Sequence, residues 1–230
     1  MDPSISPFFN PRGVVILGAS ADPAKLGWFV ARNMLRSGYA GAIHFVNPKG
    51  GQLSGRPIYR TVAEVPDPVD LAVLIVPAPA TPLALTAVAG RGIRSVIISA
   101  GGFREAGPQG AALESECLHI AREHNMRLIG PNCIGLIDLH LPLDTSFVTL
   151  PPTPKGDLAL TSQSGAVCGL LIDWAQEQGF GFSRLLSLGN QADITETDML
   201  PGVVEDEHTR AVTFYIESIR DGRRFVGGKS

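Results

Sequence analysis

Short apolar runs alternate along this chain with longer amphipathic stretches, and this alternation constrains the fold more than any other feature of the sequence. A strand, a crossover helix and a second strand form the repeating unit of a parallel sheet with helices on its faces. We expect strands at Gly13–Leu17, Ala42–Val46, Leu71–Val76, Ser95–Ser99 and Arg127–Ile129, with helices at Trp28–Arg36, Pro79–Arg91 and Gln109–His124. The sequence therefore predicts an α/β fold with a doubly wound parallel sheet.

The rhythm stops after Asp138, where segment 139–157 contains four prolines and has no clear period. Such a segment is typical of a linker. A second series follows, with strands expected at 158–161, 183–189 and 211–217 and helices at 166–178 and 198–206. We therefore expect a first domain over residues 1–145 and a second over 146–230. Three strands and two helices give the second domain a small core, so we expect it to be truncated.

Composition argues against several classes of partner. The 230 residues are 44% hydrophobic and 18% charged, and the formal net charge of −3 gives no general attraction for nucleic acid or an anionic membrane. No apolar run approaches the roughly 18 residues of a membrane helix. The three cysteines include no C-x-x-C pair, so we expect reduced thiols rather than a set of disulfides or a zinc site. The five histidines lack metal-ligand spacing. We expect a cytoplasmic protein with no nucleic acid, no membrane and no metal site.

The turn after the first strand has part of a nucleotide-binding signature. Gly18 stands where a dinucleotide-binding loop begins, but Ser20 and Pro23 occupy its second and third glycine positions, so the NAD fingerprint is absent. The Ser20 hydroxyl can cap a helix and donate to a phosphate, and Lys25 and Gly27 follow on the same segment. The turn fits a phosphate site and an ordinary serine-capped turn equally well.

The end of the second strand favours a phosphate. An NAD site needs Asp or Glu there to accept hydrogen bonds from the ribose, whereas this chain has Asn47, Pro48 and Lys49. A lysine attracts a ribose phosphate, which NADP carries on the 2′-oxygen and coenzyme A on the 3′-oxygen; a solvated loop lysine is the alternative. Two further strands end in small residues, at the sheet edge where open α/β folds bind ligands. The alternative is that these small residues only form ordinary turns. These are Val76, Pro77, Ala78, Ser99, Ala100 and Gly101.

In the second series, a strand enters a helix through a run of hydroxyl and small residues. Hydroxyls and free N–H groups at a helix N-terminus form a good anion site, so we predict phosphate binding at Ser162, Gln163, Ser164, Gly165 and Ala166. A serine-hydrolase elbow does not fit, because Ser162 occupies the first glycine position of G-x-S-x-G and His208 lies in a polar stretch. Glu217 stands at the end of an apolar strand, where it either orients a catalytic group or faces solvent.

Eight short motifs, in this order, cover nearly the whole chain: FFNPRGVVILGAS, VNPKG, VDLAVLIVPA, ISAGGFREAG, GPNCIGL, TSQSGA, SLGNQADI and YIES. Together they resemble the NDP-forming acyl-CoA synthetases, which are related to the α subunit of succinyl-CoA synthetase. The resemblance implies a Rossmann-like CoA-binding domain followed by a partial, flavodoxin-like succinyl-CoA-synthetase domain.

The resemblance also implies roles for individual residues. Coenzyme A would place its phosphates on the Gly18–Ser20 turn and Lys49 and would extend along the strand ends. The CoA-binding residues would be Gly18, Ala19, Ser20, Lys25, Gly27, Asn47, Pro48, Lys49, Val76, Pro77, Ala78, Ser99, Ala100, Gly101, Pro131 and Asn132. Residues 162–166 would face a phosphohistidine, which Glu217 would orient.

In such enzymes a nucleotide phosphorylates a histidine, and an acyl phosphate and an acyl-CoA follow. That histidine lies in a Ser-His-Thr-Gly-type motif, which this sequence lacks, and ATP, ADP and Mg²⁺ bind an ATP-grasp domain or β subunit. The resemblance implies the CoA-binding part of an ADP-forming acid–CoA ligase of the acetate–CoA type, acting on a small acyl substrate in an oligomer and inactive alone. The alternatives are a CoA-sensing module of a protein lysine acetyltransferase and an NADP-dependent oxidoreductase, although TSQSGA and SLGNQADI do not fit the latter.

Overall fold

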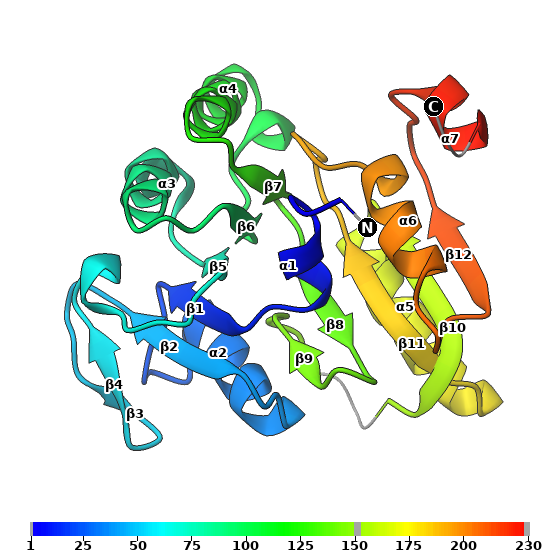
Figure 1. Ribbon diagram of the computed structural model, residues 1–230, viewed down its shortest axis with the longest axis horizontal. Helices are drawn as coiled ribbons and strands as arrows, with labels where there is room; N and C mark the ends of the chain where they lie inside the picture. Colours follow the sequence, from blue (N-terminus) through cyan, green and yellow to red (C-terminus); the bar gives the residue numbers. More distant parts are fainter. Residues whose placement is uncertain (1, 150–152, 228–230) are drawn as a thin grey trace.

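The computed structural model describes residues 2–149 and 153–227, which form two β-sheets flanked by helices (Figure 1). The seven-stranded sheet consists of β1 (Gly13–Leu17), β2 (Ala42–Val46), β3 (Gln52–Leu53), β4 (Arg56–Tyr59), β5 (Leu71–Leu74), β6 (Ser95–Ile98) and β7 (Arg127–Ile129). The five-stranded sheet consists of β8 (Leu136–Asp138), β9 (Leu143–Asp144), β10 (Lys155–Ser162), β11 (Phe182–Ser187) and β12 (Ala211–Tyr215).

The helices occupy the faces of these sheets and the space between them (Figure 1). The α-helices are α1 (Ser6–Phe9), α2 (Leu26–Ser37), α3 (Thr81–Gly90), α4 (Pro108–Glu123), α5 (Gly165–Gln178), α6 (Glu196–Val204) and α7 (Gly222–Gly227). Short 3₁₀ turns lie at Val62–Glu64, Ala78–Ala80 and Arg104–Ala106. Helices α2 and α5 end at Gly38 and Gly179, whose φ angles of +88° and +74° suit glycine at a helix C-terminus.

The first sheet has the strand order of a doubly wound nucleotide-binding fold. Its order is β3-β4-β2-β1-β5-β6-β7, and every neighbouring pair except β3–β4 is parallel. The chain therefore winds outward from β1 in both directions. All five residues of β1 are buried. The side chains of Val14–Leu17 alternate between two hydrophobic clusters, one containing residues of α2 and the other residues of α3 and α4. This confirms the predicted fold class.

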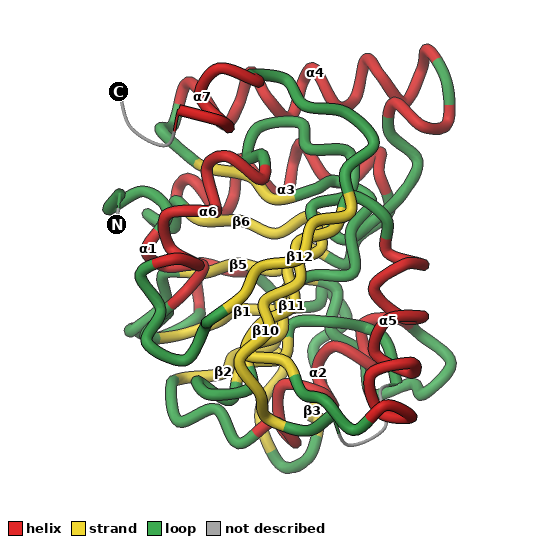
Figure 2. Tube along the Cα trace, turned by 90° about the vertical axis from the view of Figure 1, so that its right-hand side faces the viewer, coloured by secondary structure: helices red, strands yellow, loops and turns green. Residues whose placement is uncertain are grey.

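The second sheet combines a parallel core with an antiparallel hairpin. Its order is β12-β10-β11-β8-β9, with β10 parallel to both β11 and β12, as in flavodoxin-like folds. Strand β8 runs antiparallel to β11, and Asp138 pairs with Arg184 through an Oδ2–Nε distance of 2.7 Å. Helices α5 and α6 cover opposite faces of this sheet, and its strands run across the direction of the first sheet (Figure 2).

Segment 139–157 is not the linker that the sequence predicted. It contains β9 and the start of β10, and the Leu143 side chain is buried in the core. A two-residue strand is too short to show alternation, so its proline-rich surroundings dominate the sequence signal. The β3–β4 hairpin and β8 were also not predicted, and the strands expected to end at Val76 and Ser99 end at Leu74 and Ile98.

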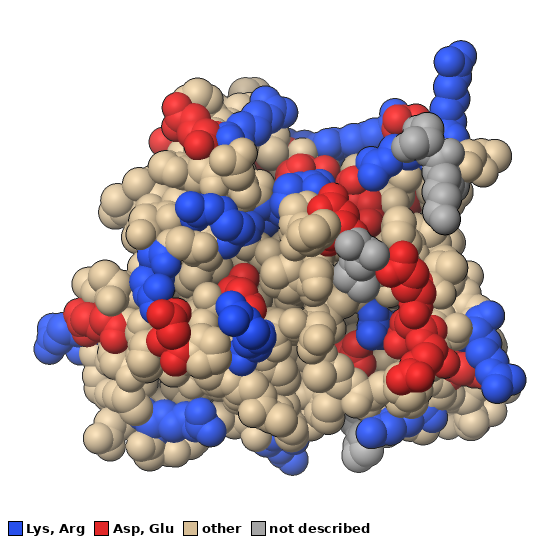
Figure 3. Space-filling view, viewed as in Figure 1, with Lys and Arg blue, Asp and Glu red and all other residues tan. Residues whose placement is uncertain are grey.

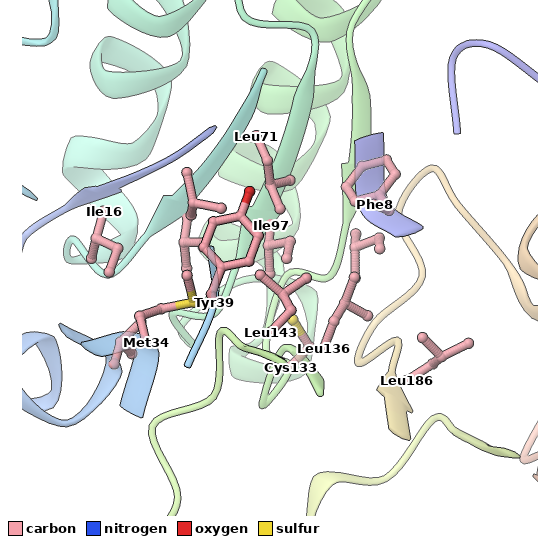
Figure 4. Close-up of a cluster of buried hydrophobic side chains, with 14 of the residues drawn as sticks. Phe8, Ile16, Met34, Tyr39, Leu71, Ile97, Cys133, Leu136, Leu143 and Leu186 are labelled. Carbon is pink, nitrogen blue, oxygen red and sulfur yellow. The ribbon is translucent and has the colours of Figure 1, made fainter. Parts of the chain in front are cut away.

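One hydrophobic cluster joins the two sheets (Figure 4). It contains Ile16 and Leu71 of the first sheet together with Leu136, Leu143 and Leu186 of the second, all nearly or fully buried. Hairpin β8–β9 thus belongs to the second sheet although its residues precede position 145. The division into domains at residue 145 stays a prediction.

Candidate functional site

A cleft of about 920 Å³ lies between the two sheets, and both contribute to it. The first sheet supplies side chains that follow β6 and β7, and the second supplies the loop into α5 and the segment after β12. Of the residues predicted as functional, the cleft collects Ser99, Asn132, Gln163, Ser164, Gly165, Ala166 and Glu217. The cleft therefore brings together parts of both predicted sites.

The first turn of α5 lines the cleft. Ser164 is the N-cap residue, and its Oγ accepts a hydrogen bond from the Val167 amide at 3.4 Å. Gly165 leaves room for Ile134, since a Cβ at position 165 would lie 2.9 Å from Ile134 Cγ1 and one of the two would have to shift. A 14-residue helix carries partial positive charge at this end, which favours an anionic group in the cleft. Ser162 is buried, and its hydroxyl donates to the Ser164 carbonyl at 2.7 Å, so it supports the loop from behind.

Gln163 connects this loop to the segment after β12. Its Oε1 accepts hydrogen bonds from the amides of Glu217 and Ser218 at 2.9 and 3.1 Å, and its Nε2 donates to the Ser218 carbonyl at 2.7 Å. Below this clamp, the buried Glu196 carboxylate accepts a hydrogen bond from Gln191 Nε2 at 2.6 Å. The clamp fixes the backbone that carries Glu217, whose side chain is exposed at the rim of the cleft.

The first-sheet wall of the cleft is built from the ends of β6 and β7. The backbone N–H of Asn132 donates to the Ala100 carbonyl at 2.9 Å. A Cβ at Gly101 would lie 3.2 Å from Oδ1 of the Asn132 side chain. The Ser99 hydroxyl is buried near the Cys133 thiol and makes no hydrogen bond of normal geometry with any described residue. Burial raises the pKa of Cys133 to about 12, so this thiol stays protonated.

Four polar residues link the two walls of the cleft. Asn190 Nδ2 donates to Glu105 Oε2 at 2.5 Å and to Glu114 Oε2 at 2.9 Å, while the Arg104 guanidinium binds the Asn190 carbonyl and Glu114. Burial opposes ionisation of Glu105, but hydrogen bonds from Asn190 and from the amides of residues 102 and 103 lower its pKa. No role was predicted for these residues from the sequence, although Arg104 and Glu105 lie within the motif ISAGGFREAG and Asn190 lies within SLGNQADI.

The turn after β1 lies along the same sheet edge as the cleft. Gly18 has a φ of +92°, and a Cβ at Gly27 would lie 1.9 Å from the Gly18 carbonyl oxygen, so α2 begins directly against the turn. Asn47 Nδ2 donates to the Ala19 carbonyl at 2.9 Å, and Ser20 Oγ accepts the Asp22 amide at 3.0 Å. Gly18 and Gly27 therefore fill two structural roles of a phosphate-binding turn, a tight bend and close helix packing.

The other predicted residues lie on this edge outside the cleft. Lys25, Pro48, Lys49 and Pro77 are exposed, and Ala19, Ala78 and Pro131 are buried. Backbone hydrogen bonds connect consecutive strand ends, from Gly18 to Val46, from Ile75 to Leu17, from Ser99 to Leu74 and from Asn132 to Ala100. The turn and the cleft are thus two ends of one continuous edge. The assignment of these residues to a ligand stays a prediction.

Charge and metal-ligand patterns add little to this site. On the face shown in Figure 3, basic and acidic side chains are interspersed. Within residues 2–149 and 153–227, no three His, Cys, Asp or Glu side chains come together in a way that suits a metal ion. In the same ranges, no helix combines the length and apolar character needed to cross a membrane. Cys117, Cys133 and Cys168 are free thiols in the interior.

Two family models match the chain. A model described as a CoA binding domain matches residues 12–138, and one described as a succinyl-CoA ligase like flavodoxin domain matches residues 155–228. The first match covers all strands of the first sheet and β8, and the second covers β10, β11 and β12. Together they confirm the predicted resemblance.

Several similar proteins are longer than this chain. The α subunit of ADP-forming acetate–CoA ligase I from Pyrococcus furiosus is 40% identical over 97% of this chain and 49% of that subunit. The ADP-forming 4-hydroxybutyrate–CoA ligase of Nitrosopumilus maritimus is 33% identical over 96% of this chain and 32% of its own length. The structure of Ca. Korarchaeum cryptofilum dinucleotide forming acetyl-coenzyme A synthetase 1 with phosphate and ADP has a TM-score of 0.90 and 32% identity, over 96% of this chain and 47% of that one.

The chain thus spans about half the length of the acetate–CoA ligase α subunit, or less of the longer relatives. Its similarity to them extends over both sheets and the loops between them. By the matched models and the two-sheet fold, the chain belongs to the CoA binding domain family and has the arrangement of the N-terminal, α-like portion of NDP-forming acyl-CoA synthetases.

Proposed function

We propose that this chain is the CoA-binding part of an ADP-forming acyl-CoA ligase. Coenzyme A lies along the carboxyl edge of the first sheet, with its phosphates on the Gly18–Ser20 turn and Lys49 and its thiol in the cleft. The observation that carries the proposal is the continuity of this edge, which leads from a tight glycine turn to the N-terminus of α5. The family of the chain and the ligase relatives support the same assignment.

The residues of the chain have distinct tasks in this proposal. The amides of the first turn of α5 bind the phosphate of a phosphohistidine that another part of the enzyme supplies, because the helix N-terminus favours anions. Glu217, held through its backbone by Gln163, orients that histidine. Coenzyme A supplies the thiol that accepts the acyl group. The division of one transfer into two steps is covalent catalysis.

The remaining parts of the reaction belong to a partner. ATP or ADP and Mg²⁺ bind an ATP-grasp domain or β subunit, and the complete enzyme is an oligomer in the cytoplasm. The lengths of the relatives support a further domain or subunit, since the chain spans only 49% of the P. furiosus subunit. The chain by itself binds CoA and does not complete the reaction.

Calorimetric titration of the purified chain with CoA, dephospho-CoA, NADP and NAD tests the proposal. CoA is expected to bind about tenfold more tightly than dephospho-CoA, because a charge-assisted contact to the 3′-phosphate is worth roughly 1–2 kcal/mol. Lys49→Ala should remove this difference, while Lys155→Ala, at an exposed lysine on β10, serves as the control. If Lys49→Ala lost affinity for CoA and dephospho-CoA equally, Lys49 would not bind the 3′-phosphate. Binding of NADP without CoA would overturn the proposal.

A further inference from the structure

The cleft has one apolar wall. Ile134, Phe147 and Val148 line the cleft together with Gly169 of α5, and Ile134, Val148 and Gly169 also line a smaller cavity next to it. Ile134 packs against the first turn of α5, since its Cγ1 lies 2.9 Å from the position of a Cβ on Gly165. Gly169 follows one turn later on the same helix. The apolar wall therefore begins beside the amides that face the anionic group.

Space continues behind this wall. A small cavity of about 10 Å³ shares Ile134, Val148 and Gly169 with the cleft and extends toward the buried side chains of Cys168 and Ile172. A cavity of this size is about that of one water molecule, and an apolar one lacks the partners that a water needs. The wall is thus incompletely packed at the position of Gly169.

Packing gives no reason for a glycine at position 169. A Cβ built there would meet no atom within 4 Å, whereas the Cβ at Gly165 would clash. A glycine inside a helix is also less favourable than an alanine. What the missing side chain provides is open space in the cleft, one turn from the helix N-terminus.

The charges around the cleft disfavour a second anion on this side. Among the described residues that line it, Arg104 is the only lysine or arginine, and it already contacts Glu114 and the Asn190 carbonyl. Glu105 and Glu217 add carboxylates to the same cleft. A dicarboxylic acyl group would bring a further negative charge without a free cation to receive it.

We propose that Ile134, Phe147, Val148 and Gly169 form the acyl-group subsite, which takes an uncharged, apolar acyl group whose size Gly169 sets. The inference rests on the proposed CoA site, because the thiol must end in the cleft for its acyl group to reach this wall. A side chain at position 169 occupies the space of the acyl group and leaves the pantetheine and phosphate contacts unchanged.

Titration of the chain with CoA, isovaleryl-CoA and succinyl-CoA tests the subsite. Isovaleryl-CoA should bind at least about fivefold more tightly than CoA, since the branched acyl group buries apolar surface, and succinyl-CoA should gain no such increase. Gly169→Val should remove the gain for isovaleryl-CoA and leave the affinity for CoA within about twofold, with Gly169→Ala intermediate. Gly90→Ala, at the end of α3 where a Cβ also meets no atom, is the matched control.

The outcomes separate the two proposals. Failure of the wild-type chain to bind CoA overturns the proposed function and the subsite with it. If the wild-type chain binds CoA but Gly169→Val loses affinity for CoA and isovaleryl-CoA equally, the subsite alone is overturned. Binding of succinyl-CoA as tight as that of isovaleryl-CoA also overturns it. Thermal unfolding of each variant shows whether it is folded.

Discussion

The side chain of Gln163 holds the backbone of Glu217 in place: Gln163 Oε1 accepts the Glu217 amide at 2.9 Å. Two further bonds to Ser218 complete the clamp, which joins the ends of the adjacent parallel strands β10 and β12 at the cleft. The position of the Glu217 backbone therefore depends on a side chain more than fifty residues earlier in the sequence.

Gln163→Leu should release this segment. The substitution removes the three hydrogen bonds of the clamp and a longer fourth bond, of 3.4 Å, from Gln163 Nε2 to Glu196 Oε2. Because the side chain is partly exposed, the free energy of unfolding should fall by only about 1–2 kcal/mol. Urea denaturation measures this loss, and hydrogen exchange of the amides of residues 217 and 218 should become faster. Unchanged exchange at both amides would show that the clamp does not order the segment.

Gly27→Ala should disturb the turn that we assign to the phosphates of CoA. The new Cβ would lie 1.9 Å from the Gly18 carbonyl oxygen, so α2 must move away from the turn. We expect a loss of more than about 2 kcal/mol in the free energy of unfolding, as for other overpacked sites, and weaker binding of CoA. Denaturation and calorimetry measure the two effects, and stability equal to that of Gly90→Ala would contradict the close contact.

Two glycines of the second sheet's helices should respond in opposite directions to alanine. Gly169→Ala should raise the free energy of unfolding by up to about 1 kcal/mol, because a helical glycine is replaced without a clash. Gly202→Ala should lower it by about 1–3 kcal/mol, since its Cβ would lie 2.5 Å from Phe9 Cε2. Parallel urea titrations compare the two variants. A loss of stability in Gly169→Ala would show that the helix needs its glycine for packing.

Asp144 should make stability depend on pH. Burial raises the pKa of its carboxyl from 3.8 to about 6, with hydrogen bonds from Ser146 and the charge of Arg32 opposing part of this rise. Between pH 4 and pH 6 the folded chain therefore holds a proton that the unfolded chain has lost. Its contribution is present below pH 4 and is lost as the pH rises through about 6.

The comparison with Asp144→Asn isolates this effect. The asparagine keeps an acceptor for the Ser146 amide, which bonds to Asp144 Oδ1 at 2.9 Å, but does not ionise. Between pH 4.5 and pH 7.5, the wild type should lose about 2 kcal/mol of unfolding free energy relative to the variant. Parallel pH dependence of the two proteins would mean that Asp144 titrates normally in the folded state.

Strand and helix bounds are predicted best where the residues of a single element form a clear local pattern. The bounds of β1, β2 and β7 agree with the prediction because continuous apolar runs such as Val14–Leu17 are bounded by polar or turn residues. Helix α6 begins at Glu196 rather than Asp198, because Thr195 and Asp198 form a capping box that the pattern did not reveal.

The sequence predicts the cleft only in part, because many of its contacts join residues far apart in the chain. The loop before α5, which the sequence predicts to bind an anion, is a local feature, and residues 163–166 of that prediction line the cleft. The bond from Asn190 to Glu105 joins residues 85 positions apart, and the apolar wall combines Phe147 with Gly169. No local period encodes such contacts, since they arise only when the two sheets pack together.

The hydrophobic cluster that joins the two sheets has a consequence for inheritance. A gene segment ending at residue 145 would encode β8 and β9 without β11, and Leu136 and Leu143 would lose the members of their cluster that the second half supplies, such as Leu186 and Leu188. Recombination at this point would therefore expose apolar surface of the cluster on both products. A rearrangement that keeps β8 and β9 on the same gene segment as β11 avoids this exposure.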